Sequence, residues 1–231
     1  DSTNTYGVKN FDKLKDKTAV SALVQTQGKG RFNRVWICET LDNLCLSLVL
    51  KPEKIAHIAN LTQYMSVCTC KVIETYGLKP QIKYPNDVLI DEKKVCGILC
   101  ESVLKKNIIQ GVVLGIGVNL NMPLSLIEKI EKPATSLNLL TGHSIDRQEF
   151  LEKLLKEFFS KYQDVIERGF CSFEQEYLKR NNFLGKTVYI QQRDNTPKEQ
   201  YTAIAMDKNG NLVVRTNEGN QKTIFSGDLM F

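Results

Sequence analysis

The sequence predicts an α/β domain, in which a mixed sheet is backed by helices, followed by a small β-barrel. Up to about residue 182, apolar runs typical of strands occur together with helical patterns. From Phe183 onward, short apolar segments separated by turn residues follow one another, which is typical of a small all-β unit. We therefore expect two domains, at residues 1–182 and 183–231, with a boundary near Asn181 and Asn182.

In the first domain, apolar runs and end signals place the elements in order. The predicted strands are residues 44–50, 81–84, 88–90, 95–103 and 108–118. The turn at Asp91-Glu92-Lys93 predicts an antiparallel hairpin. Helices are predicted over residues 54–76 (ended by Gly77), 137–140 (capped by Thr135-Ser136 and ended by Gly142), 146–168 (a capping box of Asp146 and Glu149) and 172–180 (the same device at Ser172 and Gln175).

The second domain reads as strands joined by short turns. The predicted strands are residues 187–190, 201–205, 212–215 and 222–225, and the turns between them are residues 195–197, 207–210 and 218–220. Short strands at this spacing predict a small barrel appended to the α/β part.

Composition excludes several classes of function. No apolar run approaches the roughly 18 residues that a membrane span needs. The net charge of +5 is modest for a nucleic-acid-binding protein. Residues 183–231 contain six Lys/Arg and five Asp/Glu, so most of the excess lies in the first domain and fits a small anionic ligand. The seven cysteines lack the paired spacing of a zinc site, so we expect buried thiols in a reducing cytoplasm.

A glycine-rich basic loop follows the apolar run at residues 19–24. It reads Gly28-Lys29-Gly30-Arg31-Phe32-Asn33-Arg34-Val35-Trp36, with two glycines, three cations and no carboxylate. Glycines let backbone N–H groups approach an anion, and Lys and Arg add charge-assisted hydrogen bonds. Trp36, the only Trp, is placed to clamp a base or close a pocket. We predict an anion-binding loop, with a solvated basic loop as the alternative.

Four further clusters each have a structural alternative. Ser2-Thr3-Asn4 would also serve as a helix cap, and Lys83-Tyr84-Pro85-Asn86-Asp87 as a plain turn. Lys94 begins an apolar strand that contains Gly97, and its alternative is a surface lysine. The run Gly115-Ile116-Gly117-Val118-Asn119 lacks the third glycine and the following helix of a dinucleotide fingerprint, which excludes a Rossmann site.

Taken in order, these clusters closely resemble the biotin protein ligases. The matching segments are Q-x-x-G-K-G-R-x-x-x-x-W, K-Y-P-N-D, K-x-x-G-I-L, G-I-G-V-N-L-N and Ala134-Thr135-Ser136-Leu137. The resemblance covers nearly the whole chain. It implies a catalytic domain related to class II aminoacyl-tRNA synthetases and a C-terminal SH3-like barrel.

The resemblance also implies a reaction and a set of site residues. Family members join biotin to ATP as biotinyl-5′-adenylate and transfer the biotinyl group to a lysine of a biotin carboxyl carrier domain. The residues implied to bind biotin are Ser2, Thr3, Asn4, Gln25, Gly28, Lys29, Gly30, Arg31, Tyr84, Lys94 and Gly97. Those implied for ATP or the adenylate are Lys29, Arg31, Trp36, Asn86 and Asn119. Lys94, Arg31 and Asp87 are the implied catalytic residues, and Asp87 the implied Mg²⁺ contact.

Two positions depart from the family pattern. Lys29 replaces the first arginine of G-R-G-R, which keeps the charge but loses the planar fork. Tyr84 replaces the tryptophan of K-W-P-N-D and keeps an aromatic face, so we expect it to retain a packing role or to line the biotin pocket.

Three alternatives remain open. A lipoate ligase or octanoyl transferase shares the fold, but the G-K-G-R loop speaks against it. A biotinyl-adenylate-dependent repressor would need a helix-turn-helix domain upstream, and because residue 1 opens inside a motif we expect further sequence there. A non-catalytic carrier-binding module is disfavoured by the intact set of cations. We expect neither a membrane nor a nucleic acid as partner of this chain, and a homodimer is left open.

Overall fold

The computed structural model describes residues 1–38, 43–192, 196–225 and 227–230. Its main element is a six-stranded sheet with the strand order β1-β2-β6-β5-β4-β3. All pairings between these described strands are antiparallel, so the expected mixed sheet is wrong. The reason is that β3 to β6 follow one another through short turns, whereas parallel neighbours would need a crossover helix between them.

The strands of this sheet lie close to their predicted positions. They are β1 (Thr18–Ala22), β2 (Leu44–Leu50), β3 (Gln81–Lys83), β4 (Asp87–Ile90), β5 (Lys93–Lys105) and β6 (Ile108–Val118). The predicted hairpin joins β4 to β5, and its two turn residues, Asp91 and Glu92, both have positive φ, as a tight two-residue hairpin turn requires.

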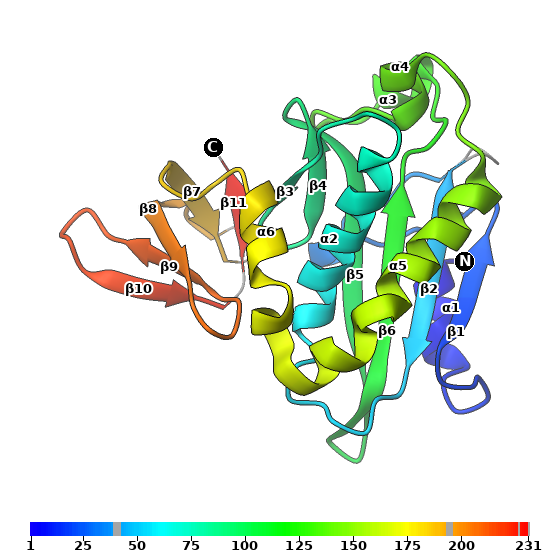
Figure 1. Cartoon of the computed structure of the whole chain (residues 1–231), viewed down its shortest axis with the longest axis horizontal. Coiled ribbons are helices and arrows are strands. Elements are labelled where there is room, and N and C mark those ends of the chain that lie inside the picture. The colour runs from blue at the N-terminus through cyan, green and yellow to red at the C-terminus, as the bar shows by residue number, and fades with distance from the viewer. Residues whose placement is uncertain (39–42, 193–195, 226, 231) are drawn as a thin grey trace.

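The long helices of the chain cover one face of this sheet (Figure 1). The helices are α1 (Thr3–Lys9), α2 (Asn60–Glu74), α3 (Leu124–Ile127), α4 (Leu137–Thr141), α5 (Arg147–Arg168) and α6 (Glu174–Arg180). Helix α2 lies against the sheet and is buried along most of its length. Aromatic side chains join it to α5 and to the start of α6, because the Tyr64 ring contacts that of Phe158 in α5 and that of Phe173, the residue before α6. Helix α1 packs on the other face, where Phe11 contacts Val49 and Val113.

The helix starts test the predicted caps. Asp146 caps α5 as expected, because its side chain accepts a hydrogen bond from the Glu149 N–H. The predicted Ser172 cap is wrong: residues Gly169–Ser172 form a 3₁₀ turn, in which the Ser172 hydroxyl donates to the Gly169 carbonyl. Ser136 precedes α4, but its hydroxyl donates to the Met122 carbonyl. Helix α2 begins at Asn60, later than predicted, and Gly77 follows it with φ +77.

The C-terminal residues form a second antiparallel sheet with the order β10-β9-β8-β7-β11. Its strands are β7 (Thr187–Gln191), β8 (Glu199–Met206), β9 (Leu212–Arg215), β10 (Gln221–Ile224) and β11 (Asp228–Met230). Four of them match predicted strands, whereas β11 has too short a pattern to be recognised in the sequence. Asn195, in the first predicted turn, lies outside the described residues.

The two sheets are joined by buried polar contacts. The side chain of Asn60 donates to the Asn209 carbonyl at 2.8 Å, and that of Gln63 donates to the Gly210 carbonyl at 2.7 Å. Both donors come from the first turn of α2. The second sheet is therefore anchored to the start of a core helix.

Two cysteines differ from the expectation of free thiols. Cys38 and Cys45 form a disulfide, and both are buried. Cys38 forms an isolated antiparallel bridge with Gln25, and Cys45 lies near the start of β2. This proximity depends on tertiary structure, so spacing in the sequence does not reveal it. Cys68, Cys70, Cys96, Cys100 and Cys171 are free thiols, and most of them are buried as expected.

None of the helices in the described part of the chain combines the length and the apolar character needed to cross a membrane.

Candidate functional site

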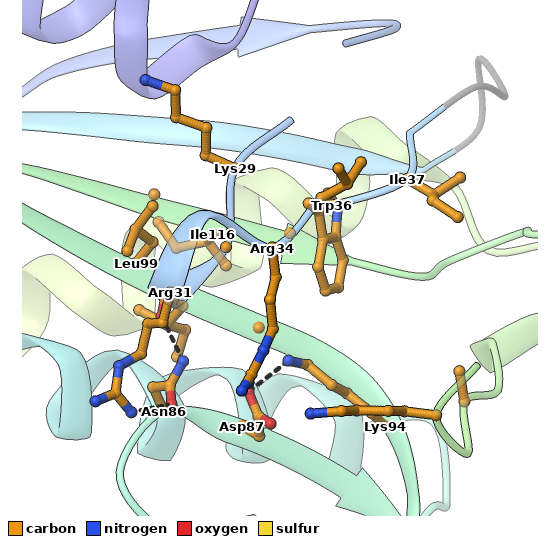
Figure 2. Close-up of a pocket in the computed structure, with 18 of the residues that line it drawn as sticks. Lys29, Arg31, Arg34, Trp36, Ile37, Asn86, Asp87, Lys94, Leu99 and Ile116 are labelled. Carbon is orange, nitrogen blue, oxygen red and sulfur yellow. Dashed lines mark hydrogen bonds and ion pairs between the residues drawn. The ribbon is translucent and has the colours of Figure 1, made fainter. Parts of the chain in front are cut away.

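A cavity of about 550 Å³ brings together nearly all of the predicted site residues. The cavity lies above the strands of the main sheet and beneath the glycine-rich loop (Figure 2). Its lining includes every predicted residue except Gly28: Ser2, Thr3, Asn4, Gln25, Lys29, Gly30, Arg31, Trp36, Tyr84, Asn86, Asp87, Lys94, Gly97 and Asn119. The separate sequence clusters thus form one site.

The floor of the cavity is one row of residues that runs across four strands. Lys83 of β3 is opposite Asp87 of β4, Asp87 is opposite Gly97 of β5, and Gly97 is opposite Gly117 of β6. Residues paired in this way present their side chains on the same face of the sheet. The two glycines leave room for the Trp36 ring, because a Cβ at Gly117 would lie 2.3 Å from the indole and one at Gly97 2.9 Å from it.

Polar side chains form one end of the cavity. Gln25 Oε1 accepts hydrogen bonds from the Thr3 N–H at 2.7 Å and from the Thr3 hydroxyl at 3.1 Å. The Ser47 hydroxyl of β2 lies 2.7 Å from Thr3 Oγ1 and 2.5 Å from Asn4 Oδ1. Gly115 of β6 makes room for this amide, since a Cβ there would lie 2.2 Å from Asn4 Oδ1. This buried network can recognise a ligand with several hydrogen-bonding groups.

The same segment also begins helix α1. The Ser2 side chain accepts a hydrogen bond from the Thr5 N–H, which makes Ser2 the N-cap. Thr3 and Asn4 occupy the first turn, and both are buried. Asn4 Nδ2 donates to Glu101 Oε2 at 2.7 Å, which fixes the orientation of the amide. The two interpretations of Ser2-Thr3-Asn4, helix cap and site, are therefore compatible.

Charged side chains form the other end. Lys94 Nζ is 2.6 Å from Asp87 Oδ1 and 5.5 Å from the centroid of the Trp36 ring. Figure 2 shows this ion pair beneath the loop that carries Arg31 and Arg34. Asp87 Oδ1 is buried and makes no hydrogen bond beyond this ion pair.

The glycine-rich loop contacts both Asn86, before β4 of the main sheet, and the start of β11 in the second sheet. Arg31 Nη1 lies 3.3 Å from Asn86 Oδ1, 3.2 Å from the Gly227 carbonyl and 3.5 Å from Asp228 Oδ1. Arg34 also forms an ion pair with Asp228, the first residue of β11. Two loop arginines thus share one carboxylate of the C-terminal sheet.

Gly28 has a structural reason for being glycine, although it does not line the cavity. A Cβ at this position would lie 2.2 Å from the Trp36 carbonyl oxygen. The Trp36 N–H donates to the Gly28 carbonyl at 2.9 Å, which closes the base of the loop. Gly28 therefore permits the close approach that brings Trp36 over the floor.

Tyr84 and Asn119 have mainly structural contacts. Tyr84 is 5% exposed, its ring packs edge-on against Phe183, and its hydroxyl donates to the Ile224 carbonyl at 3.1 Å. Tyr84 therefore packs as expected, and its contacts are with Phe183 and with Ile224 of β10. Asn119 Nδ2 donates to the Thr135 carbonyl at 3.0 Å, which leaves Asn119 Oδ1 as its remaining polar group at the cavity.

Sequence reasoning missed several residues that line or support the cavity: Ser47, Lys83, Glu101, Arg34, Lys132 and Asp228. Lys83 begins the K-Y-P-N-D motif and Arg34 lies in the glycine-rich loop, so their positions in these motifs could have identified them. Asp228 is far away in the sequence, so only the tertiary structure reveals it.

The cavity carries an excess of positive charge. Three acidic residues line it, Asp87, Glu131 and Asp228, against seven cationic ones, Lys29, Arg31, Arg34, Lys83, Lys94, Lys129 and Lys132. Burial is the main cause that lowers the pKa of Lys83, and the charges of Lys132 and Lys94 add to it. Asp87 and Asp228 act in the opposite direction. This charge balance suits a polyanionic ligand such as a nucleoside triphosphate.

The side chains around the cavity offer few ligands for a metal ion. No group of three or more His, Cys, Asp or Glu side chains suited to a metal occurs within the described residues. The carboxylate of Asp87 is a hard oxygen donor, and its buried Oδ1 lies 2.6 Å from Lys94 Nζ. It fits a Mg²⁺ ion that takes most of its ligands from phosphate and water.

Comparison with known proteins identifies similar chains. The model of the Biotin/lipoate A/B protein ligase family matches residues 1–119. A biotin–[acetyl-CoA-carboxylase] ligase of Paracoccus denitrificans is 33% identical, over 96% of this chain and 93% of that protein. The bifunctional ligase/repressor BirA of Bacillus subtilis is 33% identical over 92% of this chain, which spans 65% of the length of BirA.

A solved structure has the same fold. The biotin protein ligase of Aquifex aeolicus, in complex with biotin and ATP, has a TM-score of 0.84 and 29% sequence identity to this chain. The match covers 100% of this chain and 94% of the Aquifex chain.

Proposed function

Because the chain belongs to the Biotin/lipoate A/B protein ligase family, we propose that it activates biotin with ATP and attaches it to a lysine of a biotin carboxyl carrier domain. One observation carries this proposal: the cavity has a neutral polar end and a cationic end above one continuous floor. The polar end suits the ureido group of biotin, and the cationic end suits the phosphates of ATP.

The first step joins two anions, the biotin carboxylate and the α-phosphate, which repel each other. Lys94 and Arg31, which line the same cavity, lower this repulsion by their positive charge. Gly97 and Gly117 let the Trp36 ring approach the floor closely, where it contacts the nucleoside. The product, biotinyl-5′-adenylate, stays beneath the glycine-rich loop, and the loop protects it from hydrolysis.

The second step needs a neutral acceptor amine. Asp87 orients this amine and accepts its proton when the carbon–oxygen bond to AMP breaks. The ion pair of Asp87 with Lys94 keeps both groups at the reacting carbonyl. Mg²⁺, when bound with ATP, neutralises phosphate charge, and Asp87 is the residue that would contact it.

The C-terminal sheet also contributes to the site. We propose that it is the SH3-like barrel of this family, and that the larger domain is related to class II aminoacyl-tRNA synthetases. Arg31 and Arg34 contact the C-terminal sheet at Gly227 and Asp228, which supports a role of this sheet in closing the site.

The first experiment is mass spectrometry of a biotin carboxyl carrier domain after incubation with this protein, biotin and Mg-ATP. We expect one biotin at a single lysine. The Lys94→Ala variant should lose this activity, whereas Lys93→Ala, at the exposed neighbouring position, should keep it. Competition with lipoate and octanoate tests the choice of acid. No addition of biotin despite tight biotin binding would contradict the proposal.

A further inference from the structure

Lys83 lies at the cavity, but the reaction described so far does not use it. It is the last residue of β3, at the edge of the main sheet, and is half-buried. Within the described residues its ammonium has no hydrogen bond or ion pair, and the carboxylate opposite it, Asp87, is 2.6 Å from Lys94 instead. A half-buried cation without a direct ion pair is partly uncompensated, so a ligand with negative charge is its natural partner.

The order of groups along the floor suggests which part of the ligand this is. The polar end, with Asn4 and Ser47, lies over β2 and β6, and the ion pair of Asp87 with Lys94 lies over β4 and β5. Lys83 is one strand further in the same direction, or about 4.8 Å beyond Asp87. The cationic groups therefore continue past the reacting centre, away from the polar end.

The geometry of phosphoryl transfer indicates which group leaves toward Lys83. In the adenylation step, a carboxylate oxygen of biotin forms a bond to the α-phosphorus. The bond from that phosphorus to the bridging oxygen breaks, and its electron pair stays on pyrophosphate. Because the attacking and leaving oxygens lie roughly in line, pyrophosphate departs on the side opposite biotin. With biotin at the polar end, this is the side of Lys83.

We propose that Lys83, together with the nearby Lys132, binds the pyrophosphate leaving group of the adenylation step. This assignment rests on the proposed function. The Lys83 ammonium neutralises the charge that develops on the bridging oxygen, and no proton transfer is needed. Lys132 lines the same cavity and is exposed, and its charge acts together with burial to lower the pKa of Lys83.

The test separates the two half-reactions in the full-length protein. The first is formation of biotinyl-5′-adenylate and pyrophosphate from biotin and Mg-ATP. The second is transfer from supplied biotinyl-5′-adenylate to the carrier domain. Lys83→Met keeps the apolar stem but removes the charge. We expect about 100-fold slower adenylation, the size of effect seen when one preorganised donor is lost. Transfer should stay within twofold of the wild-type rate.

Reversal of the first step gives a second readout. Pyrophosphate should convert bound biotinyl-5′-adenylate back to ATP about 100-fold less efficiently in Lys83→Met, by the same argument. Lys83→Arg should recover most of both rates. The matched control is Lys93→Met, which removes an exposed lysine outside the cavity and should change neither.

The possible outcomes distinguish the two proposals. If the wild-type protein forms no biotinyl-5′-adenylate, the proposed function fails. If the wild-type protein is active and Lys83→Met slows both half-reactions equally, Lys83 has a general structural role and the assignment is overturned. Unchanged adenylation in Lys83→Met would overturn it as well.

Discussion

The floor glycines allow the two ends of the cavity to be perturbed separately. Gly115 and Gly117 lie two residues apart on β6 and face the same side of the sheet. Neither has a positive φ, so alanine fits the backbone at both positions. A Cβ at Gly117 would lie 2.3 Å from the Trp36 ring, and one at Gly115 would lie 2.2 Å from Asn4 Oδ1. Each alanine therefore displaces one side chain.

The size of the effect follows from these contacts. Carbon atoms pack at about 3.5 Å, so in Gly117→Ala the indole must move by about 1.2 Å. Stacking of a base on an aromatic ring is worth about 1–3 kcal/mol, so we expect ATP to bind about 5- to 150-fold more weakly. Biotin affinity should change little. In Gly115→Ala the displaced Asn4 loses a hydrogen bond to biotin worth about 1 kcal/mol, so biotin should bind about fivefold more weakly.

Calorimetry with biotin and with a non-hydrolysable ATP analogue measures both affinities. Emission of Trp36, the only Trp, reports its displacement independently. Each of the two variants, Gly115→Ala and Gly117→Ala, serves as the control for the other. If both variants bound biotin and the ATP analogue more weakly to the same extent, the assignment of biotin to the polar end and of ATP to the Trp36 end would be refuted. ATP affinity unchanged in Gly117→Ala despite shifted emission would refute contact between Trp36 and the nucleotide.

Two further predictions concern residues around the cavity. Arg31→Gly removes the contacts with Asn86 and Asp228, so biotinyl-5′-adenylate should escape and label bystander lysines; acceptor selectivity equal to that of the wild type, measured by mass spectrometry, would contradict loop closure. Burial raises the pKa of Tyr84 to about 12, so its hydroxyl stays a donor at neutral pH. Tyr84→Phe should lower the free energy of unfolding by about 1 kcal/mol in a urea titration and leave ligation intact, and a large loss of activity would mean that the hydroxyl contacts a ligand.

The sequence predicted those parts of the molecule that depend on local signals. Strands β2 and β6 follow from their apolar runs. The Asp146 cap follows from one side chain that accepts a hydrogen bond from an N–H three residues later in the chain. The Ser172 cap was wrong because the chain tightens into a 3₁₀ turn there, and the same residue spacing then serves a different hydrogen bond.

The candidate site was predicted where its residues lie in compact motifs. The residues that hold these side chains in place were not predicted. Ser47, Glu101 and Asp228 reach the site from other strands. Their roles depend on strand register, which no local pattern specifies. The disulfide of Cys38 with Cys45 was missed for a similar reason, since only tertiary structure brings the two sulfurs together.

The strand order of the main sheet has a consequence for folding kinetics. Strands β3 to β6 are consecutive, so the part of the floor with Lys83, Asp87 and the glycines can assemble through local contacts. Strand β2 pairs with β6 across a long chain separation, and it carries Ser47 of the polar end. Closing such a separation costs more entropy and is slower. During refolding, the part of the floor that runs from Lys83 to Gly117 should therefore gain its structure before the polar end that Ser47 completes.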